Sequence, residues 1–173
     1  RGDLAIEFIN KATKLGHNIV IVDGKSSKSF KKTVITNAAV ILKNRRTQKR
    51  SPAKRKAFKI ASKLENIKVI LTTEPEKVDI LNSIDKIVAP ILAGEASIVI
   101  PKREDNLFKT SYPRYQYESE VEGNKLYNEY LRANDLLKDS EEDLDMFFGP
   151  RAFLNDRKVL SLFMRKFKIK VKK

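Results

Sequence analysis

The chain is 173 residues long, and with 41% hydrophobic residues it is large enough for one domain, over residues 1–173, around a buried core. It has no cysteine and one histidine, which excludes disulfides, thiolate metal sites and multi-histidine zinc sites. Its 36 basic and 22 acidic residues give a formal charge of +14, which favours polyanionic partners. Without a membrane-length apolar run or a signal-peptide pattern, we expect a cytoplasmic protein with no membrane span.

The first half of the chain alternates helical and strand patterns. Apolar spacing predicts a helix over residues 3–15. A short β-branched run at 19–22 predicts a strand buried on both faces, and a second strand is expected at 38–42. Ser51 and Pro52 suit the N-cap and the first position of a helix that runs to residue 64.

The second half continues this alternation. We expect a strand at 68–72, followed by a helix that begins at Pro75 and is broken at Pro90. A strand at 97–100 and an irregular aromatic stretch at 106–120 come next. The last expected elements are a long helix at 119–137 and a helix that is capped by Asn155 and runs to residue 167. The tail at 166–173 alternates like an edge strand but also suits a disordered basic end. Strands that alternate with helices predict an α/β fold with a mainly parallel sheet flanked by helices.

Polar or charged residues follow each predicted strand, and in parallel sheets ligands bind outside these carboxyl ends. The residues concerned are Asp23, Gly24 and Ser26 after the first strand, Lys43 after the second, Glu74 and Glu76 after the third, and Lys102 and Arg103 after the fourth. We expect all four ends to share one edge of the sheet. Two carboxylates beside a phosphate-binding rim can hold a hard divalent cation. Alternatively, Glu74 and Glu76 are acidic residues of a helix's first turn, and Asp23 belongs to an ordinary turn.

The segment 43–59 is the most basic part of the chain. It suits the phosphates of a nucleotide, because Ser51 opens a helix whose free N–H groups favour anions. It equally suits an RNA or DNA backbone bound without reading its sequence. The stretch after the first strand lacks the spacing of a P-loop and of a dinucleotide-binding fingerprint. We interpret His17, at a helix-to-strand turn, as structural.

Five stretches carry a resemblance to a known family: IVIVDGKSS, KVILTTEPEKVDIL, PILAGEASIVIPKRE, SYPRYQYESEVEGN and EDLDMFFGPRAF. In this order, and over nearly the whole chain, they resemble the motifs of an uncharacterised family in the nucleotide-diphospho-sugar transferase superfamily, which has the GT-A fold. The resemblance implies a Rossmann-like sheet that binds a nucleotide-sugar along its carboxyl edge with a divalent ion, Mg or Mn. Two departures are the absence of glycines from 43–58 and of the usual first strand, which is missing or precedes Arg1.

The resemblance also implies roles for individual residues. Asp23 matches the contact to the nucleobase or ribose, Glu74 and Glu76 match the metal-binding acidic pair, and Asp143 or Asp145 matches the acceptor-side base. The donor-binding residues expected from the strand ends and the basic rim are Asp23, Gly24, Ser26, Ser51, Arg55, Lys77, Lys102 and Arg103.

The predicted function is therefore that of a metal-dependent glycosyltransferase, which moves a sugar from a nucleotide-diphosphate-sugar to an acceptor. The alternative is a protein that kept the fold, lost the chemistry and binds nucleic acid or another polyanion through residues 43–59. A nucleotidyltransferase is a third, weaker hypothesis, because no glycine-rich phosphate loop stands near the N-terminus.

Overall fold

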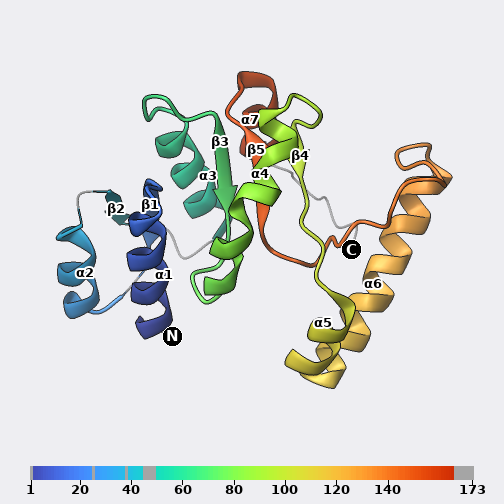
Figure 1. The fold of residues 1–173 in the computed structure, drawn as a ribbon, viewed down its shortest axis with the longest axis horizontal. Coiled ribbons are helices and arrows are strands. Elements are labelled where there is room, and N and C mark those ends of the chain that lie inside the picture. The colour runs from blue at the N-terminus through green and yellow to red at the C-terminus, as the bar shows by residue number, and fades with distance from the viewer. Residues whose placement is uncertain (1, 25, 38, 45–49, 166–173) are drawn as a thin grey trace, which may run out of the picture.

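The structure is a computed structural model that describes residues 2–24, 26–37, 39–44 and 50–165 (Figure 1). Its helices are α1 (Gly2–Lys14), α2 (Lys28–Ile35), α3 (Arg50–Ala61), the 3-10 helix η1 (Val78–Ser83), α4 (Ile84–Leu92), α5 (Asp105–Ser111), α6 (Arg114–Ala133) and α7 (Arg157–Met164). Its strands are β1 (Ile19–Asp23), β2 (Val40–Asn44), β3 (Val69–Thr72), β4 (Ile98–Val99) and β5 (Arg151–Leu154). The predicted α/β class is confirmed.

The strands form two sheets instead of the one mainly parallel sheet that we expected. β1 and β2 pair in parallel, whereas β5 lies between β3 and β4 and is antiparallel to both. The sequence pattern did not reveal β5, so the prediction of a mainly parallel sheet is wrong for the second sheet. Since β3 and β4 are both antiparallel to β5, they run in the same direction, and their carboxyl ends lie at the edge where β5 begins.

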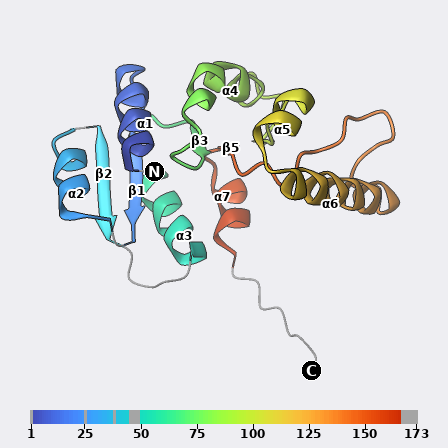
Figure 2. The ribbon, with the colours of Figure 1, turned by 90° about the horizontal axis from the view of Figure 1, so that it is seen from below.

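The core forms on both faces of β5, because successive side chains of a strand point to opposite faces. Phe153 is fully buried on one face, where it stacks on Phe163 of α7 at 4.0 Å and meets Phe58 of α3 edge-on at 5.3 Å. Ala152, on the other face, packs against Ile87 and other isoleucines of η1 and α4. In Figure 2 the two sheets lie side by side, and α5 and α6 extend away from them.

Several predicted boundaries change for local reasons. The helix expected from Pro75 begins only at η1, and Pro90 lies inside α4, which ends two residues later. The stretch expected to be irregular is helical: Glu104 caps α5 by accepting hydrogen bonds from two backbone N–H groups, and Pro113 precedes the first residue of α6. Both residues suit a helix start, since an acidic side chain satisfies free N–H groups and proline needs no N–H partner.

Other details of the prediction also change. The apolar side chains of β1 are half-buried, not buried on both faces, because its sheet has only two strands. Asp156, not Asn155, caps α7, and Asn155 instead donates hydrogen bonds to the carbonyls of Ser62 and Ile67. The tail at 166–173 lies outside the described residues. None of the described helices combines the length and apolarity needed to cross a membrane.

Candidate functional site

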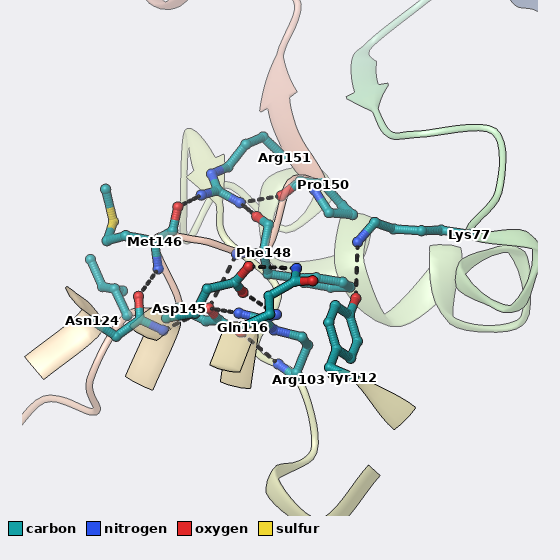
Figure 3. Close-up of polar contacts among 12 residues, drawn as sticks. Lys77, Arg103, Tyr112, Gln116, Asn124, Asp145, Met146, Phe148, Pro150 and Arg151 are labelled. Carbon is teal, nitrogen blue, oxygen red and sulfur yellow. Dashed lines mark hydrogen bonds and ion pairs between the residues drawn. The ribbon is translucent and has the colours of Figure 1, made fainter. Parts of the chain in front are cut away.

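The candidate site lies where β3 and β4 end and β5 begins. Glu74 and Lys77 follow β3, Arg103 follows β4, and Arg151 is the first residue of β5. Residues 145–150, which we call the site loop, lead into β5 and pack against α6 (Figure 3). Segments far apart in the sequence therefore supply one group of charged side chains.

Arg103 and Asp145 form a buried ion pair at the site, joined by two hydrogen bonds. Nε of Arg103 donates to Oδ2 of Asp145 at 2.7 Å, and its second terminal nitrogen donates to Oδ1 at 2.8 Å. The other terminal nitrogen of Arg103 donates to Glu120 on α6 at 2.6 Å. The guanidinium also lies over the ring of Phe108, 3.5 Å from its centre. All three nitrogens of Arg103 are engaged, so this side chain is held by the protein itself.

Asp145 is saturated with hydrogen bonds. Besides those from Arg103, it accepts hydrogen bonds from the side chain of Asn124 at 2.9 Å and from the backbone N–H of Phe148 at 3.1 Å. Burial alone raises the pKa of Asp145, but the hydrogen bonds from Arg103 and Asn124 outweigh it and bring the pKa to about 2. A carboxylate held in this way is a poor proton acceptor near neutral pH. The hydrogen bonds of Asp145 instead hold the first residue of the site loop in place.

Arg151 fixes the other end of the site loop. Its guanidinium donates hydrogen bonds to three backbone carbonyls of the loop, those of Met146, Phe148 and Pro150. Burial lowers the pKa of Arg151, while the nearby charges of Asp145 and Glu74 offset part of that effect. With Arg103 at one end and Arg151 at the other, the site loop has a defined conformation.

The loop brings Gly149 against the carboxylate of Glu74. A Cβ atom at position 149 would lie 2.6 Å from Cδ of Glu74, so only glycine leaves room for this approach. Oε2 of Glu74 is buried and has no hydrogen-bond donor among the described residues, although the side chain as a whole is 37% exposed. Its nearest cation is Nζ of Lys77, at 3.9 Å. Glu74 thus carries a charge that the protein only partly compensates.

Lys77 is positioned from three sides. Besides Glu74, its ammonium faces the ring of Phe148, 4.5 Å from the centre, and donates to the hydroxyl of Tyr112 at 3.4 Å. None of these contacts is a short ion pair, so the ammonium keeps capacity for an anionic ligand.

The donor set restricts how a metal ion would bind. Within the part of the chain that the structure describes, no three acidic, histidine or cysteine side chains gather closely enough to hold one. Glu76, the expected second ligand, is exposed. The orphaned oxygen of Glu74 fits a hard cation whose remaining ligands come from phosphate oxygens and water, which is how Mg²⁺ is usually bound. The residues do not fit a cation held by the protein alone.

The other predicted site residues lie elsewhere. At the end of β1, the buried Asp23 accepts a hydrogen bond from the hydroxyl of Ser26 and pairs with Nζ of Lys31 at 3.1 Å. Burial raises the pKa of Asp23, but these partners outweigh it and lower the pKa overall. Gly24 follows directly after the end of β1, and the sheet of β1 and β2 is separate from that of β3 in the described part of the chain.

Four more predicted residues are outside the site's contact network. Ser51 and Arg55 lie on α3, and Lys102 is an exposed neighbour of Arg103. Asp143 is exposed and pairs with Arg132 at 2.8 Å. The prediction that all strand ends share one edge is therefore right for β3 and β4 alone and wrong for the two sheets together.

Sequence reasoning missed several members of the site. They are Tyr112, Glu120, Asn124, Phe148, Gly149 and Arg151. All six lie inside two stretches that carry the family resemblance, SYPRYQYESEVEGN and EDLDMFFGPRAF. Their position in these two stretches was the sequence feature that could have identified them as site residues.

Comparison with known proteins places the chain in no family. It matches no family model, and no curated protein and no solved structure is significantly similar to it.

Proposed function

We propose that the protein is a glycosyltransferase of GT-A type, a single Rossmann-like domain that binds a nucleotide-diphosphate-sugar at the edge formed by β3 and β4. One observation carries this proposal. Four of the five stretches that resemble the family, spread over residues 68–153, meet at the candidate site through Glu74, Arg103, Tyr112 and Asp145. Residues that form one functional site are brought together by the fold in this way, whereas four chance matches have no reason to converge.

Lys77 is the residue best suited to the diphosphate. Its ammonium is held at the site by Phe148 and Tyr112 but lacks a short ion pair within the part of the chain that the structure describes. A fixed cation stabilises the charge that develops on the leaving nucleoside diphosphate. Arg103, which we expected to bind phosphate directly, instead positions the site loop, because its nitrogens are bonded to Asp145 and Glu120.

Glu74 is the residue that would hold Mg²⁺ or Mn²⁺ together with the donor's phosphates. The ion would supply further electrostatic stabilisation of the leaving group. Asp145 is unsuited to be the base that accepts the acceptor's proton, and Asp143, the other predicted base, lies outside the site's contact network. Asp145 is saturated and has a pKa of about 2, and Oδ1 of Asp143 takes part in an ion pair with Arg132.

Binding of a donor is expected to raise the melting temperature of the protein. A panel of UDP- and GDP-sugars, each with and without Mn²⁺, is tested by thermal shift, because a ligand that binds only the native state stabilises it. At a donor concentration about 100 times the Kd, the stabilisation is about 2.7 kcal/mol. The expected result is a shift for at least one donor that is larger with Mn²⁺. No shift with any donor at millimolar concentration contradicts the proposal.

Gly149→Ala is expected to separate binding from stability. The new methyl group displaces the carboxylate of Glu74, which is the end of a flexible side chain, so the free energy of unfolding changes by less than about 1 kcal/mol. Binding of the Mn²⁺–donor complex, followed by calorimetric titration, is expected to weaken at least about tenfold.

Gly123→Ala is the matched control. It makes the same substitution, and its methyl group meets the ring of Phe147 and not Glu74. If both variants lost donor binding equally, the result would contradict a specific role of the Glu74–Gly149 contact in binding the donor.

A second candidate function is polyanion binding by the basic part of the chain. Lys43 at the end of β2 and Lys54 and Lys59 on α3 are exposed, and Lys56 donates to the carbonyl of Asn44. These cations lie on β2 and α3, separate from the Glu74–Lys77 site. Binding of RNA or DNA that weakens steeply with salt and survives Glu74→Ala would favour this function.

A further inference from the structure

One face of α6 exposes large apolar side chains. Tyr115, Leu126 and Tyr130 share this face by helical spacing and are 75%, 58% and 62% exposed. Next to them, the exposed rings of Tyr127 and Phe147 contact each other edge-on at 5.9 Å. We call these five side chains the α6 face. Exposed aromatic groups on one face of a helix are typical of protein interfaces, where tyrosine is enriched.

The surroundings of the α6 face are acidic. Glu122 and Glu129 lie along the same helix and are exposed, whereas Glu118 is paired with Arg114. Residues 104–145 contain 12 acidic and 5 basic residues, although the chain as a whole is strongly basic. This charge repels nucleic acid and anionic lipid, and two α6 faces packed on each other would bring glutamates together. The partner of this face is therefore basic.

The chain itself offers a matching basic surface on α2. Lys28, Lys32 and Ile35 are spaced i, i+4 and i+7, so they share one face of that helix. All three are exposed, with Ile35 at 65%. The chain outside residues 104–145 contains 31 basic and 10 acidic residues. α2 thus combines an apolar side chain with cations, which complements the α6 face.

The two surfaces lie at opposite ends of the molecule. In both Figure 1 and Figure 2, α2 is at one end of the long axis and α6 is at the other. We propose that the α6 face of one copy docks on α2 of a second copy, head to tail. Because the two surfaces differ, the α6 face at one end of the assembly and α2 at the other end stay unoccupied after each copy is added. Association therefore continues beyond a closed two-fold dimer. This proposal does not depend on the glycosyltransferase activity.

Sedimentation equilibrium of the purified chain tests the proposal. The weight-average mass is expected to rise at least about twofold between micromolar and about 200 µM protein at low salt, and to fall towards the monomer at about 0.5 M NaCl, where attraction between opposite charges is screened. A monomer at every concentration in low salt overturns the proposal. Association that strengthens with salt also overturns it, because the charge complementarity would then not contribute.

Paired variants identify the two surfaces. The first variant alters the α6 face and combines Tyr115→Ser, Leu126→Ser and Tyr130→Ser. The second variant alters α2 and combines Lys28→Glu with Lys32→Glu. All five positions are exposed, and circular dichroism checks that each variant folds. Each variant alone is expected to be monomeric. Their mixture is expected to give 1:1 heterodimers, since each retains one intact surface. Leu92→Ser, at an exposed apolar position on α4, is the control that keeps association. A mixture that stays monomeric, or an α6 variant that associates like wild type, overturns the proposal.

Discussion

Asp145→Ala is expected to lower the free energy of unfolding by about 3–5 kcal/mol, measured by urea denaturation. The side chains of Arg103 and Asp145 are only 8% and 7% exposed, so the substitution leaves a buried guanidinium with Glu120 as its remaining carboxylate partner. Removing one partner of a buried ion pair costs more than the pair itself contributes, because the remaining charge stays desolvated. The site loop would also lose its first attachment.

Asp143→Ala is the matched control, two residues away. Its ion pair with Arg132 is exposed, so we expect a change of about 0–1 kcal/mol. A double-mutant cycle adds a second check. Arg103→Met is expected to cost less in the Asp145→Ala background than in the wild type, because the unpaired charge is then removed. Equal costs in the two backgrounds would show that the ion pair is not coupled as described.

The same ion pair gives the protein an acid-sensitive component of stability. The pKa of Asp145 is about 2 in the folded state and 3.8 for an unperturbed aspartate, so the unfolded chain takes up this proton first as the pH falls. The stabilisation is complete above about pH 4 and is lost between about pH 4 and pH 2. That pKa difference corresponds to on the order of 2 kcal/mol. Urea midpoints between pH 5 and pH 2 are expected to fall less steeply in Asp145→Ala than in the wild type.

Lys77→Met is expected to weaken donor binding about 10- to 100-fold, as hydrogen bonds to charged groups contribute about 1.5–3 kcal/mol. Methionine keeps the length of the side chain and its packing near Phe148 but removes the charge. The measurement is calorimetric titration with the donor that gives the largest thermal shift. The expected change in folding stability is small, because the ammonium has no short ion pair.

Lys109→Met is the control for Lys77→Met. It removes one positive charge from an exposed position on α5. It therefore tests whether the net charge of the protein alone governs donor binding. Equal weakening in both variants would contradict a specific role for Lys77.

The sequence predicted those helices and strands whose own residues carry a clear hydrophobic pattern. The β-branched run of β1 and the apolar spacing of α1 gave their positions within one or two residues. β5 was missed because its four residues follow a Gly-Pro pair and carry no strong strand pattern; pairing with β3 and β4, distant in the sequence, defines it. Pro113 was interpreted as part of an irregular stretch, although it marks the start of α6.

The sequence named some residues of the candidate site but did not predict their roles. Glu74, Lys77, Arg103 and Asp145 were all named from the sequence, and the structure groups them at or beside one edge. Their roles depend on contacts that spacing does not reveal. Arg103 and Asp145 are 42 residues apart, and their pairing converts an expected phosphate ligand and an expected base into a support for the site loop. The approach of Gly149 to Glu74 likewise depends on the conformation of that loop.

A crystal structure of the protein with its best nucleotide-sugar and Mn²⁺ tests the central claim most directly. We predict that the diphosphate lies within about 4 Å of Nζ of Lys77, the distance of an ion pair. The metal ion is predicted to contact Glu74 and the phosphate oxygens, with Arg103 still bonded to Asp145. A nucleotide bound only among the lysines of residues 43–59, with the edge of β3 and β4 empty, would contradict the account.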